Sequence, residues 1–179
     1  MKNIALIGPR GVGKSKISKR ISKITELPVL STDSLAVYET GGLSIADFVE
    51  RHDGKWQPFR DLEYSILQKL SSAQGIILDC GGGILFDVDE NGEEILSERK
   101  IKILQEMANI IFLDNDIDLL VEKVSSDKTR PSLHSKKDYK DILRFRLPHY
   151  KEVAHYRLYL GDMKKEEAAK RIIELTDIH

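Results

Sequence analysis

The chain opens with a short apolar run and a glycine-rich loop, and this pair of features leaves few possible folds. Residues 8–15 read Gly-Pro-Arg-Gly-Val-Gly-Lys-Ser and directly follow the apolar run 4–7. They match the phosphate-binding loop G-x-x-x-x-G-K-[ST], which joins a buried strand to a helix. A glycine turn that binds nothing is the alternative, but every fixed position of the motif is present and an amphipathic helical pattern follows. The motif predicts an α/β fold with a site for a nucleoside triphosphate.

Each part of this loop suits a chain of phosphates. The glycines let backbone N–H groups approach phosphate oxygens closely. Lys14 can reach the outer phosphates, Ser15 can offer its hydroxyl to Mg²⁺, and the helix that begins here adds the positive end of its dipole. We expect the following residues to bind the nucleotide: Gly11, Val12, Gly13, Lys14, Ser15 and Lys16.

Length and composition indicate one soluble domain over residues 1–179. The 28 basic and 29 acidic side chains nearly balance, which disfavours a nucleic-acid partner. A single cysteine, Cys80, rules out an internal disulfide and fits a reducing compartment. No apolar run reaches the length of a membrane span, and the chain enters a strand pattern at once, without the pattern of a signal peptide. We expect a cytoplasmic protein without a membrane partner.

Short apolar strands alternate with helical patterns along the chain. The strands are expected at 3–8, 28–31, 75–80, 109–113 and 157–160, and the helices near 14–26, 34–41, 44–53, 57–72, 93–107, 116–125, 138–155 and 164–175. This order predicts a parallel sheet covered by helices on both faces. The polar, basic stretch 126–138 is expected to form an exposed flap, and the acidic stretch 86–100 a surface excursion.

The third expected strand ends in Asp79 and is followed at once by Gly81, Gly82 and Gly83. An aspartate at this place in a phosphate-loop enzyme holds Mg²⁺, directly or through water, although it could instead simply cap the next turn. Bare backbone at the carboxyl end of a parallel strand lets a ligand approach closely. We therefore expect a metal site at Ser15 and Asp79.

Charged residues suited to a second substrate appear at four further places. Asp33 follows the second strand, and Arg60 lies on a helix three residues before Glu63, which is close enough to steer the guanidinium. Arg130 opens the basic flap, and Arg146 lies in a late helical segment. Taken singly, each arginine is more often a surface ion pair than a ligand contact.

Together and in this order, these motifs resemble the shikimate kinase family over roughly residues 1–160. The matching elements are the phosphate loop, an aspartate after the second strand, Phe59-Arg-x-x-Glu63, Gly81-Gly-Gly83, Arg130-Pro131 and Arg146-x-Pro148-x-Tyr150. The resemblance implies a P-loop kinase fold, a three-layer sandwich with a five-stranded parallel sheet and a mobile lid at about 126–138. It also implies ATP-dependent phosphorylation of the 3-hydroxyl of shikimate, giving shikimate 3-phosphate and ADP, which is a step of aromatic amino acid biosynthesis. We expect the enzyme to be a monomer.

The resemblance assigns roles to individual residues. Lys14, Asp33 and Arg130 would be catalytic, with Asp33 placed to accept the proton of the hydroxyl. Arg60 and Arg146 would hold the carboxylate of shikimate as planar, bidentate partners, and residues 81–83 would contact it through their backbone. Arg130 would close over the phosphates, and Lys123 would lie near the adenine.

One departure from the family pattern concerns the metal. The family has an aspartate where this chain has Ser31, and a small neutral residue where this chain has Asp79. Our hypothesis is that the carboxylate has moved from one strand to its neighbour, which keeps the local charge. A second departure is the longer connection between the glycines and residue 109, which we expect to be a surface loop.

Three other functions remain open at this stage. The acceptor could be another hydroxy acid, as in gluconate-type kinases, although these lack the order of the glycine and arginine motifs found here. Ser31 would also fit a relative that binds nucleotide with weakened catalysis. A GTP-dependent switch is disfavoured because the sequence has no guanine-reading Asn-Lys-x-Asp segment.

Overall fold

The computed structural model describes residues 3–125 and 138–177, and its centre is a five-stranded sheet in the order β2-β3-β1-β6-β7. All four neighbouring pairs are parallel, which confirms the predicted sheet. The strands are β1 Asn3–Ile7, β2 Val29–Ser31, β3 Ile77–Asp79, β6 Ala108–Asp114 and β7 Tyr156–Tyr159. The helices are α1 Lys14–Thr25, α2 Thr32–Glu39, α3 Ile45–Arg51, α4 Gln57–Leu70, α5 Glu98–Met107, α6 Ile117–Ser125, α7 Tyr139–Val153 and α8 Lys165–Thr176.

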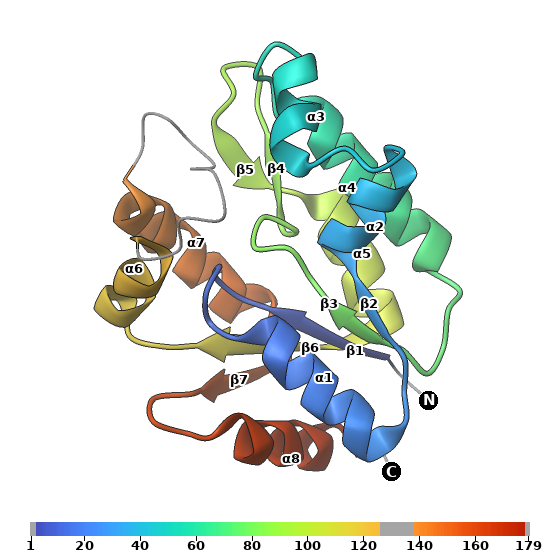
Figure 1. Cartoon of the computed structure of the whole chain (residues 1–179), viewed down its shortest axis with the longest axis vertical. Coiled ribbons are helices and arrows are strands. Elements are labelled where there is room, and N and C mark those ends of the chain that lie inside the picture. Colours follow the sequence, from blue (N-terminus) through green and yellow to red (C-terminus); the bar gives the residue numbers. More distant parts are fainter. Residues whose placement is uncertain (1–2, 126–137, 178–179) are drawn as a thin grey trace.

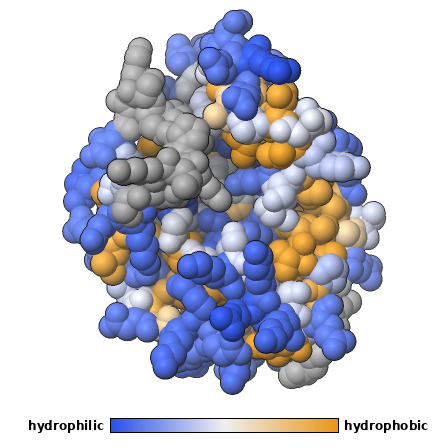
Figure 2. Space-filling model, viewed as in Figure 1, coloured by the Kyte–Doolittle hydropathy of each residue, from blue (hydrophilic) through white to orange (hydrophobic). Residues whose placement is uncertain are grey.

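Helices cover both faces of the sheet and make three layers, as predicted (Figure 1). Helices α1 and α8 pack side by side, while α5 and α7 contact β6. The central strand β1 is completely buried, as strands covered on both faces must be. Figure 2 shows that hydrophilic side chains cover the outer side of α1, whose Lys16, Lys19 and Arg20 are exposed.

A second, smaller core joins α2, α3 and α4. It is formed by Ala36, Val49, Phe59 and Ile66, all buried. Trp56 and Phe59 meet edge to face with ring centroids 5.7 Å apart, a favourable geometry for aromatic rings. This core holds α4 with the side chain of Arg60 buried.

The segment after the three glycines is where the sequence-based expectation was wrong. The stretch 86–100 is not a mere surface excursion, because it contains an antiparallel hairpin of β4 Phe86–Val88 and β5 Glu94–Leu96. The expected helix 93–107 begins only at 98, where the Ser97 side chain accepts a hydrogen bond from the backbone N–H of Lys100. The hairpin turn closes because Asp89 accepts hydrogen bonds from two backbone N–H groups of the turn.

This topology brings the ends of β1, β2 and β3 to one edge of the sheet, here called the carboxyl edge. The phosphate loop follows β1, Asp33 follows β2, and the three glycines follow β3. Ligands of open parallel sheets bind at this edge. Among the helices of the described ranges, none combines the length and apolar character needed to cross a membrane.

Candidate active site

The phosphate loop leads from β1 into α1 with the geometry that its motif predicts. Gly13 precedes the helix with φ 112°, a conformation that L side chains rarely adopt. The buried Lys14 ammonium donates hydrogen bonds to the carbonyl oxygens of Gly8 and Pro9 at 2.7 and 2.9 Å. The lysine therefore folds back over its own loop, which is where a phosphate chain would lie.

Burial and nearby negative charges act on the pKa of Lys14 in opposite directions. Burial lowers the pKa of the Lys14 ammonium below its ordinary value, and the nearby carboxylates of Asp79 and Asp33 act in the opposite direction. An anion bound at the loop would add to the effect of these two carboxylates. Cys80, the residue directly after β3, is buried, and burial raises the pKa of its thiol. The thiol is therefore protonated at neutral pH.

Ser31 and Asp79 are direct neighbours across β2 and β3. Their Cα atoms are paired in the register of the parallel strands, and Asp79 is also paired with Leu6 of β1 on its other side. The prediction that these two positions face each other on adjacent strands is confirmed. Ser31 also begins α2, because its hydroxyl accepts a hydrogen bond from the backbone N–H of Ser34 at 3.3 Å.

The three glycines lie directly against the predicted substrate-binding side chains. A Cβ placed on Gly81 would clash with the Asp33 carboxylate, and one on Gly83 would lie 2.7 Å from Nη2 of Arg60. The Gly81 N–H also donates to the hydroxyl of Thr32, next to Asp33 in α2, at 2.8 Å. Glycine is needed here because only bare backbone leaves room for these side chains.

Arg60 and Arg146, here called the arginine pair, lie together at the carboxyl edge, both almost fully buried. Arg60 donates to the Gly83 carbonyl and Arg146 to the Gly82 carbonyl, each at 3.2 Å. The hydroxyl of Tyr150 donates to the same Gly82 carbonyl. The structure thus brings together the two arginines that the sequence placed 86 residues apart.

A carboxylate of the chain itself bridges the arginine pair. Glu94 of β5 accepts a hydrogen bond from Nη2 of Arg60 at 3.2 Å and from Nε of Arg146 at 2.9 Å, and it also bonds Nη2 of Arg146. Burial acts to lower the pKa of Arg146, but the hydrogen bonds and charges of Glu94 and Tyr150 together outweigh burial, and the pKa is raised. Glu94 was not predicted as a site residue, because its acidic segment was expected to be a surface excursion.

A buried ion-pair network holds Arg60 from the other side. Glu63 accepts hydrogen bonds from Arg60 at 3.0 Å and from Lys100 at 2.8 Å, and all three side chains are buried. The predicted steering of Arg60 by Glu63 therefore has a clear geometry. Lys100 was not predicted from the sequence either. The local sequence signal for it is its position three residues after Ser97, which caps α5.

The nucleotide side of the loop carries further lysines. The exposed Lys123, near the end of α6, lies beside the loop, since a Cβ on Gly11 would be 3.8 Å from the Lys123 Cβ. Lys165 of α8 lies with its ammonium 3.1 Å from a Cβ placed on Gly13. Its pKa is lowered by partial burial and by the like charges of Lys123 and Lys16. Lys165 was not predicted from the sequence. Arg130 lies outside the described residues, as does the expected flap except for its last residue, Asp138.

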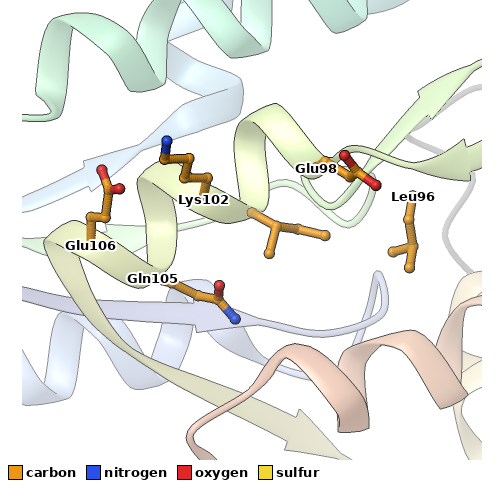
Figure 3. Close-up of a pocket in the computed structure, with 6 residues that line it drawn as sticks. Leu96, Glu98, Lys102, Gln105 and Glu106 are labelled. Carbon is orange, nitrogen blue, oxygen red and sulfur yellow. The ribbon is translucent and has the colours of Figure 1, made fainter.

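A wider hollow on the described surface lies away from these groups. It measures about 490 Å³ and is lined by Leu96, Glu98, Ile101, Lys102, Gln105 and Glu106 (Figure 3). It opens along the outer side of α5, where its charged side chains are exposed. A smaller cavity of about 50 Å³ lies at the arginine pair, between Asp33, Trp56, Glu63 and the last two glycines. The polar groups converge on the smaller cavity, so we place the active site there.

A phosphate loop and a carboxylate-binding arginine pair at one sheet edge define a P-loop kinase of small molecules. The model of the shikimate kinase family matches residues 10–177, and the chain belongs to this family.

Related proteins match this chain over nearly its full length. A shikimate kinase of Leptospira biflexa is 58% identical over 99% of this chain and 97% of its own, and one of Leptospira borgpetersenii is 54% identical over 96% of each. Among solved structures, shikimate kinase from Acinetobacter baumannii in complex with shikimate superposes with a TM-score of 0.81 at 25% identity, covering 98% of this chain and 92% of the other.

Proposed function

We propose that this enzyme transfers the γ-phosphoryl group of ATP to the 3-hydroxyl of shikimate, giving shikimate 3-phosphate and ADP. The observation that carries the proposal is the position of the arginine pair beside Asp33 and the phosphate loop on one sheet edge. The identity of the related enzymes over nearly the whole chain supports shikimate as the acceptor.

The acceptor's carboxylate would be held by Arg60 and Arg146. Both guanidiniums are buried, and charge-assisted, bidentate hydrogen bonds are strongest where water is excluded. Nε of Arg60 is also buried without a hydrogen-bond partner among the described residues, so this arginine has a donor to spare. Holding the acid at two points would fix its ring and direct one hydroxyl towards the phosphate loop.

Asp33 would position that hydroxyl and take its proton. Its carboxylate lies against Gly81. Asp33 lines the same cavity as the arginine pair, and its charge acts on the Lys14 ammonium. Lys14 and the loop's N–H groups would stabilise the charge that develops on the transferred phosphoryl group, which is the main catalytic task in phosphoryl transfer. Arg130 would add positive charge from the predicted lid, and Lys16 and Lys123 would contact the nucleotide.

The residues present fit a magnesium ion. Mg²⁺ prefers hard oxygen ligands and is usually held by one or two protein groups together with substrate phosphates. Ser15, which follows Lys14 in the chain, and Asp79, whose charge acts on the Lys14 ammonium, offer such oxygens. The described part of the chain has no cluster of three or more acidic, histidine or cysteine side chains that would hold a metal alone. When bound, Mg²⁺ would neutralise phosphate charge.

A coupled ADP-release assay tests the proposal, with shikimate, quinate, gluconate or no acceptor present. We expect turnover with shikimate far above the other three. ADP release that does not depend on an acceptor, or a preference for gluconate, would contradict it.

We also propose that residues 1–179 form a single domain and that the enzyme is a cytoplasmic monomer. Light scattering at assay concentration would reveal any dimer.

A further inference from the structure

The arginine pair already holds a carboxylate from its own chain. Glu94 receives three hydrogen bonds from the two guanidiniums, two of them from the Nε and Nη2 edge of Arg146. This side-on arrangement is the one by which an arginine binds a free carboxylate. Glu94 occupies the whole Nε and Nη2 edge of Arg146 and, within the described part of the chain, leaves Nε of Arg60 as an open donor. An acid that binds Arg146 side-on needs the edge that Glu94 holds, so Glu94 and the acid exclude each other there.

Charge balance leads to the same conclusion. Arg60, Arg146 and Lys100 are buried cations, and the carboxylates that contact them are Glu63, Glu94 and Asp87, the last of which is shared with Arg99. If Glu94 stayed in place, an incoming acid would add a negative charge beside buried arginines that are already paired with carboxylates, which is costly. If Glu94 leaves as the acid arrives, the number of charges is unchanged.

The hairpin is built so that this exchange does not disturb the fold. Its base is anchored, because Phe86 is fully buried and its carbonyl accepts a hydrogen bond from Lys100 at 2.5 Å. Its turn, residues 90–93, is exposed, and Glu94 is the first residue after that turn. Figure 1 shows the hairpin beyond the carboxyl edge of the sheet, beside α4. A change in the turn can withdraw Glu94 while the base of the hairpin stays packed.

We propose that Glu94 determines acceptor specificity by occupying the arginine pair until a carboxylate of the acceptor displaces it. The proposal rests on the proposed function, because it takes a hydroxy acid as the acceptor. Because only enzyme with Glu94 disengaged can bind the acid at both arginines, the apparent affinity is the intrinsic affinity multiplied by the fraction of enzyme in that state. A neutral acceptor cannot replace the lost carboxylate, so it leaves the buried arginines unpaired and is rejected.

The test measures the Kd of shikimate, and of its methyl ester, for the full-length enzyme by calorimetry, together with KM and kcat. In Glu94→Gln a neutral carboxamide replaces the internal carboxylate. We expect shikimate to bind about 10-fold more tightly to this variant, with a matching fall in KM and little gain in affinity for the ester. Glu94→Asp keeps the charge on a shorter side chain and should fall between. Glu90→Gln removes the same charge from an exposed place in the turn and should leave Kd unchanged.

The outcomes separate the two claims. If Glu94 only holds the arginines in position, Glu94→Gln will weaken shikimate binding or leave it unchanged while the wild-type enzyme still binds and phosphorylates shikimate; this overturns the Glu94 proposal alone. If the wild-type enzyme neither binds nor phosphorylates shikimate, the proposed function fails and the Glu94 proposal fails with it. A thermal melt of each variant without ligand verifies that it is folded.

Discussion

Replacing Asp79 by Asn removes one negative charge beside Lys14 while keeping the size of the side chain. If Asp79 helps to hold Mg²⁺, this variant should need more Mg²⁺. If the carboxylate has moved across the sheet from the position of Ser31, then Ser31→Asp should restore what Asp79→Asn removes. The structure favours this exchange, since the two residues are paired on β2 and β3, and aspartate can cap α2 as serine does.

The expected size of the effect follows from the geometry. Neighbouring strands lie about 4.8 Å apart, so the exchange moves the charge by about one strand spacing. A unit charge about 5 Å from a divalent cation interacts with it by about 1.7 kcal/mol even at the dielectric constant of water. Since each 1.4 kcal/mol is tenfold, Asp79→Asn should raise the half-saturating Mg²⁺ concentration about 15-fold. Asp79 is only 7% exposed, which makes this a lower bound.

The assay is ADP release at saturating shikimate and fixed ATP over a series of free Mg²⁺ concentrations. The wild-type enzyme, Asp79→Asn, Ser31→Asp and the double variant complete a cycle. Asp141→Asn is the matched control, because it makes the same replacement of a carboxylate by a carboxamide at an exposed position on α7. This variant should behave as wild type. An unchanged Mg²⁺ requirement in Asp79→Asn would refute the metal role. A double variant no better than Asp79→Asn would refute the exchange of positions.

Three further predictions concern the loop, the arginine pair and the buried lysine. Burial lowers the pKa of Lys14, and the charged form of Lys14 binds phosphate, so kcat/KM for ATP should fall as pH rises through a value below the ordinary 10.5. Lys14→Arg should move this fall in kcat/KM to higher pH. Lys14→Ala should lower kcat strongly at every pH. Arg60→Ala and Arg146→Ala should each raise KM for shikimate about 30-fold or more, since breaking a buried charged contact costs roughly 2–5 kcal/mol; an unchanged KM in Arg146→Ala would contradict the acid assignment. Lys100→Met removes one of the two cations that contact the buried Glu63 carboxylate and leaves Arg60 as its partner. Loss of a hydrogen bond to a charged group costs roughly 1.5–3 kcal/mol, so calorimetry should show a melting temperature lower by about 6 °C. A melting temperature within about two degrees of wild type would show that the network adds little.

The parts of the fold that local patterns encode were predicted well. The apolar run before the phosphate loop became the buried centre of the sheet, and Asp79 ended its strand as expected. Parallel strands must end at a common edge, so the motifs at their ends could be placed together before the structure was known. The pairing of Ser31 with Asp79 followed from the same reasoning.

The hairpin and its glutamate could not be predicted in this way. Each strand of the hairpin has three residues, which is too short for an alternating pattern to stand out. The partners of Glu94 are 34 and 52 residues away in the sequence, and a single glutamate in an acidic stretch carries no sign of them. Lys100 is similar, because its burial depends on Glu63, which is 37 residues earlier.

A crystal structure of the enzyme with shikimate and MgADP tests the central claim most directly. We predict that the carboxylate of shikimate contacts both Arg60 and Arg146, and that its 3-hydroxyl lies about 2.6–3.2 Å from an oxygen of Asp33, facing the phosphate loop. A carboxylate bound away from both arginines, or a 3-hydroxyl directed away from Asp33, would contradict the account.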